Sequence, residues 1–88
     1  MRRTVVKVID GDTFVVNRKI GNTNKVRLAN ADAPELYQYG GRQAANVLRK
    51  LIANKKVTIT PVARSYDRVV ANVRVRRKSV NRIIDRLF

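Results

Sequence analysis

The chain has 88 residues, of which 20 are Lys or Arg and only six are Asp or Glu, and its formal net charge is +14. It contains no cysteine and no histidine, which excludes disulfides, Cys/His zinc sites, thiol nucleophiles and His-based acid–base chemistry. At this length we expect a single small domain with one hydrophobic core. No apolar run approaches the roughly 18 residues of a membrane span, and no signal peptide is evident. We therefore expect no membrane partner and favour an intracellular or a plasmid- or phage-encoded protein.

The large positive charge indicates an anionic partner. Lys and Arg gain affinity for a polyanion by releasing its condensed counterions, so nucleic acid is the leading expectation and an anionic membrane surface a weaker one. Four of the six acids fall between positions 10 and 35. Because carboxylates repel phosphate, this clustering indicates either a bound cation or local turn and capping roles.

Three antiparallel strands are predicted in the first third of the chain, over residues 4–9, 13–17 and 24–29. Asp10-Gly11, between the first two strands, is typical of a tight hairpin turn with positive φ. We expect the Asp10 side chain to hydrogen-bond the backbone of this turn. Gly21-Asn22 provides the second turn signal.

A loop and an amphipathic helix follow the third strand. Pro34 removes a backbone donor and interrupts the strand pattern, so residues 30–35 are predicted to form a loop. Apolar side chains then recur on one face at helical spacing, which predicts a helix of about three turns over residues 44–52. Asn54 provides its stop signal.

Two further strands and a second helix complete the chain. Residues 56–60, before Pro61, are predicted as a fourth strand, and residues 69–76 alternate between an apolar and a largely basic face as a fifth. Ser79 is placed to cap a last helix over residues 80–87. Five strands with a helix after the third and a helix at the C-terminus predict a mainly β OB-fold barrel, a scaffold that commonly binds oligonucleotides.

Three acids lie where loops leave the predicted strands. Asp12 follows the first hairpin turn, and Asp32 and Glu35 lie in the loop after the third strand. Two carboxylates and a loop carbonyl are oxygen ligands suited to Ca²⁺ or Mg²⁺, with water and substrate phosphate completing the shell. The alternative is that the segment Asp10-Gly11-Asp12-Thr13 has only a structural role, because it is also typical of an ordinary hairpin turn.

Three motifs occur in order along the chain: Val8-Ile9-Asp10-Gly11-Asp12-Thr13, then Arg27-Leu28 followed by Asp32-Ala33-Pro34-Glu35, then Tyr66-Asp67-Arg68. Together they resemble the staphylococcal nuclease (thermonuclease) family, and the resemblance covers roughly residues 4–87. It implies a Ca²⁺-dependent phosphodiesterase that cuts DNA and RNA with little sequence preference and leaves 3′-phosphate products.

The resemblance also implies a set of metal ligands and a base. Asp12 and Asp32 match the family's calcium carboxylates, and Ala33 matches the residue that contributes a backbone carbonyl. Glu35 matches the proposed general base that orients or deprotonates the attacking water. A carboxylate held between a cation and arginines has a lowered pKa and is a weak base, so we expect positioning and electrostatics to contribute more than proton transfer.

Two arginines and a tyrosine complete the implied site. Arg27 and Arg68 match the arginines that grip the reacting phosphate, a role that suits the planar fork of the guanidinium. The alternative for both is a solvated basic face. Tyr66 matches a nucleotide-contacting tyrosine and could stack on a base, and the alternative is that it fills the core at a turn.

The sequence departs from the family pattern at two positions before Arg68 and at its C-terminal end. Asp67 stands where many members have Gly, and Ser65 replaces a lysine. We expect one domain over residues 1–88 that ends before the family's final loop and last helix. A homodimer or a partner chain would then cover the apolar side chains of the last helix, which are Val80, Ile83, Ile84, Leu87 and Phe88.

Two classes of function remain open from the sequence. The first is a compact calcium-dependent nuclease, acting alone or as a module completed by a partner. The second is a catalytically inactive OB-fold domain that binds single-stranded nucleic acid. The joint presence of the carboxylates and the two arginines favours the nuclease.

Overall fold

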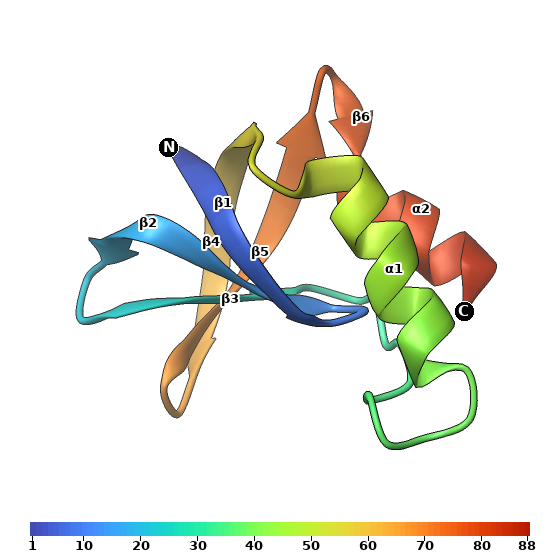
Figure 1. The fold of residues 1–88 in the computed structure, drawn as a ribbon. Helices are drawn as coiled ribbons and strands as arrows, with labels where there is room; N and C mark the ends of the chain where they lie inside the picture. Colours follow the sequence, from blue (N-terminus) through green and yellow to red (C-terminus); the bar gives the residue numbers. More distant parts are fainter.

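The fold is a five-stranded barrel of the OB type, seen in a computed structural model that describes residues 1–88 (Figure 1). Its strands lie in the sheet order β3-β2-β1-β4-β5-β6, and a parallel pairing of β3 with β5 closes the barrel. Helix α1 follows β3, and helix α2 ends the chain, which confirms the predicted fold class. The elements are β1 (Arg2–Asp10), β2 (Thr13–Ile20), β3 (Thr23–Leu28), α1 (Gly41–Ile52), β4 (Lys56–Ser65), β5 (Arg68–Val75), β6 (Lys78–Ser79) and α2 (Val80–Leu87).

Several strands run further than the sequence pattern predicts. β1 begins at Arg2, because the first residues of the chain pair with β4. The prediction that the fourth strand ends before Pro61 is wrong, since β4 continues to Ser65. A register shift between Pro61 and Ala63 marks an irregularity at the proline, where a missing N–H is tolerated. β6 is a two-residue strand that no pattern indicated.

The β1–β2 turn forms at Asp10-Gly11 as predicted, but the reason for the glycine differs. Gly11 does not have a positive φ. A Cβ on Gly11 would instead lie 2.5 Å from the Cβ of Ala44 and 2.7 Å from that of Ala33. The close packing of the turn against α1 and the loop after β3 therefore requires glycine. Asp10 Oδ1 accepts a hydrogen bond from the backbone N of Asp12 at 3.1 Å, which confirms the predicted turn contact.

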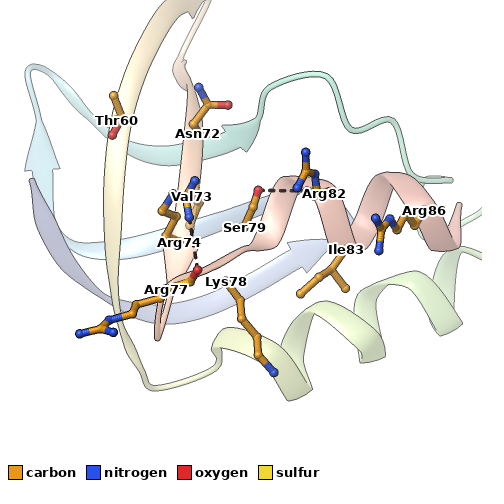
Figure 2. Close-up of a pocket in the computed structure, with 10 residues that line it drawn as sticks. All are labelled: Thr60, Asn72, Val73, Arg74, Arg77, Lys78, Ser79, Arg82, Ile83 and Arg86. Carbon is orange, nitrogen blue, oxygen red and sulfur yellow. Dashed lines mark hydrogen bonds between the residues drawn. The ribbon is translucent and has the colours of Figure 1, made fainter.

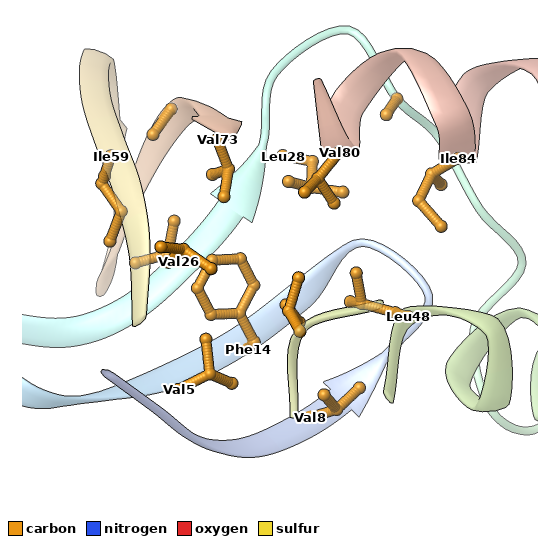
Figure 3. Packing of buried hydrophobic residues seen from close by; sticks show 14 of the residues in the cluster. Val5, Val8, Phe14, Val26, Leu28, Leu48, Ile59, Val73, Val80 and Ile84 are labelled. Atoms are coloured by element: carbon orange, nitrogen blue, oxygen red, sulfur yellow. The ribbon is translucent and has the colours of Figure 1, made fainter. Parts of the chain in front are cut away.

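One hydrophobic core fills the barrel and continues beneath both helices (Figure 3). Phe14 is fully buried within it, and Leu48 of α1 and Ile84 of α2 close the core from the helical side. Val80 and Ile84 of α2 are fully buried in the core of this chain, so the expectation that a second chain covers them is wrong. Leu87 and Phe88 at the end of the predicted apolar stripe are exposed. Each fully buried large apolar side chain contributes about 1.5–3 kcal/mol to folding, so this core accounts for most of the favourable free energy.

The predicted helix signals are confirmed. Asn54 has a φ of 62° just beyond α1, the left-handed conformation expected of a stop residue. Ser79 is the N-cap of α2, and its Oγ accepts a hydrogen bond from the backbone N of Arg82 at 3.2 Å. Neither helix has the length and apolar character needed to cross a bilayer.

Candidate active site

Three of the predicted site residues, from three separate segments, meet at the end of β3. Arg27 Nη2 lies 3.6 Å from Asp12 Oδ2 and 3.3 Å from Asp32 Oδ1. Asp12 reaches this position because its neighbour Thr13 pairs with Arg27 across β2 and β3. Asp32 lies in the loop that leaves β3. One guanidinium therefore links two carboxylates that are far apart in the sequence.

Asp12 is held on several sides by its neighbours. The residue is only 6% exposed. Thr13 Oγ1 donates to Asp12 Oδ1 at 2.9 Å, and the backbone N of Ala33 donates to Oδ2 at 3.3 Å. The backbone N of Leu28 donates to the backbone O of Asp12 at 2.8 Å. These contacts fix the carboxylate relative to both β3 and the loop that follows it.

Burial raises the pKa of Asp12 to about 6. A hydrogen bond to Asp10 and the negative charge of Asp10 act in the same direction. The Thr13 hydroxyl and the Arg27 charge oppose the shift without cancelling it. In the protein alone, the ionised form of Asp12 is therefore less stable than that of an aspartate in water. A cation bound at this carboxylate would stabilise the ionised form.

The oxygen atoms here suit a hard cation in chemical type. Asp32 is open to solvent, with 94% of its side chain exposed, and Ala33, the next residue in the sequence, offers a backbone carbonyl. Ca²⁺ takes six to eight such oxygen ligands, commonly including water and carbonyl groups. No group of three carboxylates in the chain converges to hold a metal by itself. A cation bound here would therefore need backbone, water or substrate oxygens in addition to Asp12 and Asp32.

Glu35 lies outside the cluster formed by the two aspartates and Arg27. It is exposed in the loop before α1, where its backbone N donates to Gln38 Oε1 at 2.8 Å. Hydrogen bonding to Glu35 and its negative charge raise the pKa of Tyr37. No hydrogen bond joins the Glu35 carboxylate to Asp12 or Asp32, so the structure does not bring all the predicted catalytic groups into contact.

Arg68 faces the same side of the barrel as Arg27. In the parallel ladder Arg68 pairs with Lys25, and Arg27 pairs with Val70. Val69 lies between Arg68 and Val70 on β5 and points into the core, so the side chains of Arg68 and Val70 point outward. Arg27, the partner of Val70, therefore faces outward on the same side. The two arginines are thus on adjacent strands, offset by two residues or roughly 7 Å along the strand direction.

Asp67 fixes the tip of the β4–β5 hairpin against β3. Its Oδ2 lies 2.9 Å from Lys25 Nζ, and Thr23 Oγ1 donates to its backbone O. Hydrogen bonding and attraction to Lys25 lower the pKa of Asp67. Arg68 Nε is 3.7 Å from Asp67 Oδ1. The acid at this position therefore holds the turn that carries Arg68.

Tyr66 at the same tip is fully exposed and has a φ of 54°. The interpretation that Tyr66 fills the core is therefore wrong. A left-handed residue at the apex of the hairpin directs its side chain away from the barrel, and the ring is available to a ligand.

Residues 25–85, more than half of the chain, match the family model described as staphylococcal nuclease homologue. The chain belongs to the staphylococcal nuclease family. The match begins in β3 and includes the segments that contain Arg27, Asp32, Glu35 and Arg68.

Several relatives support the same assignment to the staphylococcal nuclease family. A protein named "Uncharacterized endonuclease" from Escherichia coli is 42% identical over 72 residues, covering 78% of this chain and 45% of that protein. One of the same name from Haemophilus influenzae is 36% identical over 78 residues, covering 88% and 44%. A "Micrococcal nuclease" from Shigella flexneri is 43% identical over 61 residues, covering 67% and 33%. The chain thus spans less than half the length of each of these relatives.

One positioning residue of this staphylococcal nuclease domain has no assigned role in the sequence analysis. Asn81 is buried on α2, and its Oδ1 accepts from the backbone N of Val73 at 2.8 Å. Its Nδ2 donates to the backbone O of Ala29 at 2.8 Å and of Ala71 at 3.0 Å. Asn81 therefore ties α2 to β5 and to the start of the loop that carries Asp32. The sequence signals for Asn81 were an amide within the apolar stripe of a predicted helix and the similarity of Val80-Asn81 to the family pattern.

Proposed function

We propose that this domain is a calcium-dependent, sequence-nonspecific endonuclease that hydrolyses phosphodiester bonds of DNA and RNA to 3′-phosphate products. The observation that carries the proposal is the position of Arg27 between Asp12 and Asp32. The names of the relatives and the net charge of +14 support a nucleic-acid substrate.

Asp12 and Asp32, together with the carbonyl of Ala33, would hold Ca²⁺. When bound, the ion supplies positive charge that polarises the scissile phosphate. Asp12 is suited to this role because it is buried, fixed by two hydrogen bonds and incompletely stabilised by the protein. The exposed Asp32 leaves one side of the site open to water and substrate.

Arg27 and Arg68 would bind the reacting phosphate from neighbouring strands. Negative charge on the phosphoryl oxygens grows as the attacking oxygen adds to phosphorus. Positioned donors aimed at such charge contribute about 2.7–4 kcal/mol each to transition-state stabilisation. Side chains on two hydrogen-bonded strands keep their separation better than side chains on loops, so the barrel supplies the positioning.

Glu35 would take the proton of the attacking water. The new bond forms between the water oxygen and phosphorus, the bond from phosphorus to the 5′ oxygen breaks, and the released 5′ oxygen takes a proton from solvent water, leaving the phosphate on the 3′ side. Glu35 shares the loop between β3 and α1 with Asp32, three residues earlier, so the proposed base and the proposed metal ligand lie on one short segment. Tyr66 would stack on a neighbouring base, an interaction worth about 1–3 kcal/mol.

The deciding experiment compares cleavage of end-labelled single-stranded DNA in Ca²⁺, in Mg²⁺ and in chelator. We expect cleavage in Ca²⁺ and none in chelator. Glu35→Gln should lower the rate by about 10²–10⁴-fold, whereas Asp85→Asn, which removes the same charge from an exposed site on α2, should not. A parallel reaction on RNA of the same sequence tests the second substrate.

The product ends test the chemistry separately. A 3′-phosphate supports the proposed bond cleavage, and a 5′-phosphate contradicts it. DNA that is bound but uncut under all conditions would show instead a catalytically inactive domain that binds single strands.

A further inference from the structure

A second basic feature lies away from the candidate active site. A cavity of about 680 Å³ opens between the outer face of β4 and β5 and the side of α2 (Figure 2). Half of its ten lining residues are basic and none is acidic. These five are Arg74, Arg77, Lys78, Arg82 and Arg86.

The five basic side chains are not neutralised by ion pairs, although Asp85 lines a smaller adjoining pocket with Arg82. None of them forms an ion pair, whereas every cation that does so lies near the candidate active site. Asp85, the only acid of α2, does not line the cavity. The one hydrogen bond from a guanidinium here runs from Arg74 Nη1 to the backbone O of Arg77 at 3.2 Å. Like charges gathered without acids repel one another, and a bound anion would relieve that repulsion.

The turn between β5 and β6 gives a second, independent indication. Its two central residues, Arg76 and Arg77, have φ values of 49° and 68°. A two-residue hairpin with positive φ at both positions strongly prefers Asn-Gly. Arginine is unfavourable here because in the left-handed region its Cβ lies too close to the following carbonyl oxygen. Of the two, only Arg77 lines the cavity, and strain at such a position favours a function for its side chain beyond local folding.

The outer face of β5 connects the cavity to the candidate active site. Residues 68, 70, 72 and 74 alternate with buried ones and therefore point outward along a single strand. Arg68 stands at the active-site end, and Arg74 lines the cavity at the other. The six intervening steps span about 20 Å at the rise of a β-strand. An OB-fold contacts about 4–16 nucleotides, so one strand of nucleic acid can reach both places.

We infer that this cavity is a second phosphate-binding subsite, which holds the backbone of a single-stranded nucleic acid while its reacting phosphodiester lies at Arg27 and Arg68. The choice of nucleic acid as the anion rests on the proposed function, whereas the presence of an anion site rests on the geometry of the cavity. The subsite raises affinity for long strands and adds nothing to strands too short to span the outer face of β5.

The test measures binding in chelator, so that no cleavage competes. The probes are oligodeoxythymidylates of about 16 and about 4 nucleotides. The test variant is Arg77→Gln/Arg82→Gln/Arg86→Gln. The control variant is Lys7→Gln/Lys19→Gln/Arg49→Gln, which removes the same charge from exposed positions outside the cavity.

If the cavity binds three phosphates, the test variant loses about 100-fold in affinity for the long probe at about 0.1 M salt, and the salt slope falls by about 2. The long probe should also lose most of its advantage over the short one. The control variant should keep both its salt slope and its length dependence. Equal losses in the two variants would mean diffuse electrostatic attraction and would overturn the subsite.

A single variant guards against misfolding. Arg77→Gly relieves the left-handed strain at the turn, so its Tm should not fall while its affinity for the long probe does. If Arg77→Gly and the triple variant both bind the long probe with unchanged affinity, the proposal is overturned. Displacement of the long probe by polyglutamate as readily as by polythymidylate would assign the cavity to acidic proteins and overturn its assignment to nucleic acid. Binding is measured in chelator, independently of cleavage. A failure to cleave in Ca²⁺ would refute the proposed function, whereas the subsite is decided by the measured affinities alone.

Discussion

Gly41 and the backbone carbonyl of Glu35 lie so close that a side chain on Gly41 would overlap the carbonyl group. The loop after β3 turns back here on the first residue of α1, and the backbone N of Gly41 donates to the backbone O of Gln38 at 3.0 Å. The position of Glu35 therefore depends on the absence of a Cβ at the start of the helix.

Gly41→Ala should displace the loop that carries Glu35 and lower the cleavage rate at least tenfold, because a shift of about 1 Å at a catalytic group has effects of this size. Gly40→Ala is the control. Gly40 has a φ of 82°, but a Cβ there would meet only Pro34 Cγ at 3.7 Å. It should lower Tm through backbone strain while leaving the rate per folded molecule unchanged. A rate that falls equally in both variants would contradict the special role of Gly41.

Arg27→Lys keeps the charge of Arg27 but loses the planar fork that would engage two phosphate oxygens at once. We expect kcat/KM to fall by roughly 10²–10³-fold, the cost of one positioned donor in a transition state. Single-turnover kinetics with saturating substrate would place the loss in the chemical step. The matched change Arg18→Lys, at an exposed position on β2, should have no such effect. An Arg27→Lys enzyme with kcat within threefold of the parent would mean that charge alone suffices.

Asp12→Asn should stabilise the metal-free protein at neutral pH while abolishing cleavage. Burial raises the pKa of Asp12 from 3.8 to about 6 in the folded state, so the folded protein binds this proton more tightly than the unfolded chain. The resulting stabilisation is complete below pH 3.8 and is lost as the pH rises through about 6. A shift of this size is worth about 3 kcal/mol at most.

Thermal denaturation between pH 4 and 8 in chelator tests this linkage. The difference in Tm between Asp12→Asn and the parent should grow with pH through the range of the Asp12 titration and level off above it. Asp85→Asn, an exposed acid for which we expect no effect, is the control. A pH-independent difference would mean that Asp12 is ionised in the folded protein throughout this range.

Asn81→Ala should destabilise the fold by about 2–5 kcal/mol, because it leaves the backbone N of Val73 and the backbone O of Ala29 without partners in the interior. Urea denaturation of this variant beside Gln43→Ala, an exposed change on α1, gives the comparison. A loss below 1 kcal/mol would show that water replaces these hydrogen bonds.

The sequence predicted the barrel well because local and global signals agree along most of the chain. Val26 and Leu28 alternate with basic residues and are buried as expected, and Ser79 caps α2 as its hydroxyl allowed. The prediction failed at Pro61, where pairing on both sides of a bulge outweighs the missing donor.

The candidate site was predicted only as far as local motifs reach. Its residues could be named from their order in the chain, but their contacts depend on which strands close the barrel. The packing reason for Gly11 and the anchoring of Asp67 to Lys25 arise from segments distant in sequence. The exposure of Tyr66 likewise follows from the length of the β4–β5 hairpin, which could not be predicted from the strand propensities of its residues.

The pairing of β3 with β5 and the hydrogen bond from Asn81 to Ala29 also govern when the site can form during synthesis. The metal-ligand candidates leave the ribosome early, but the strand and helix that orient them come from the last third of the chain. A nascent chain that has made Asp12, Arg27 and Asp32 already has β2 but still lacks β5, the second partner of β3. The candidate site therefore assembles only after residue 81 has emerged from the ribosome.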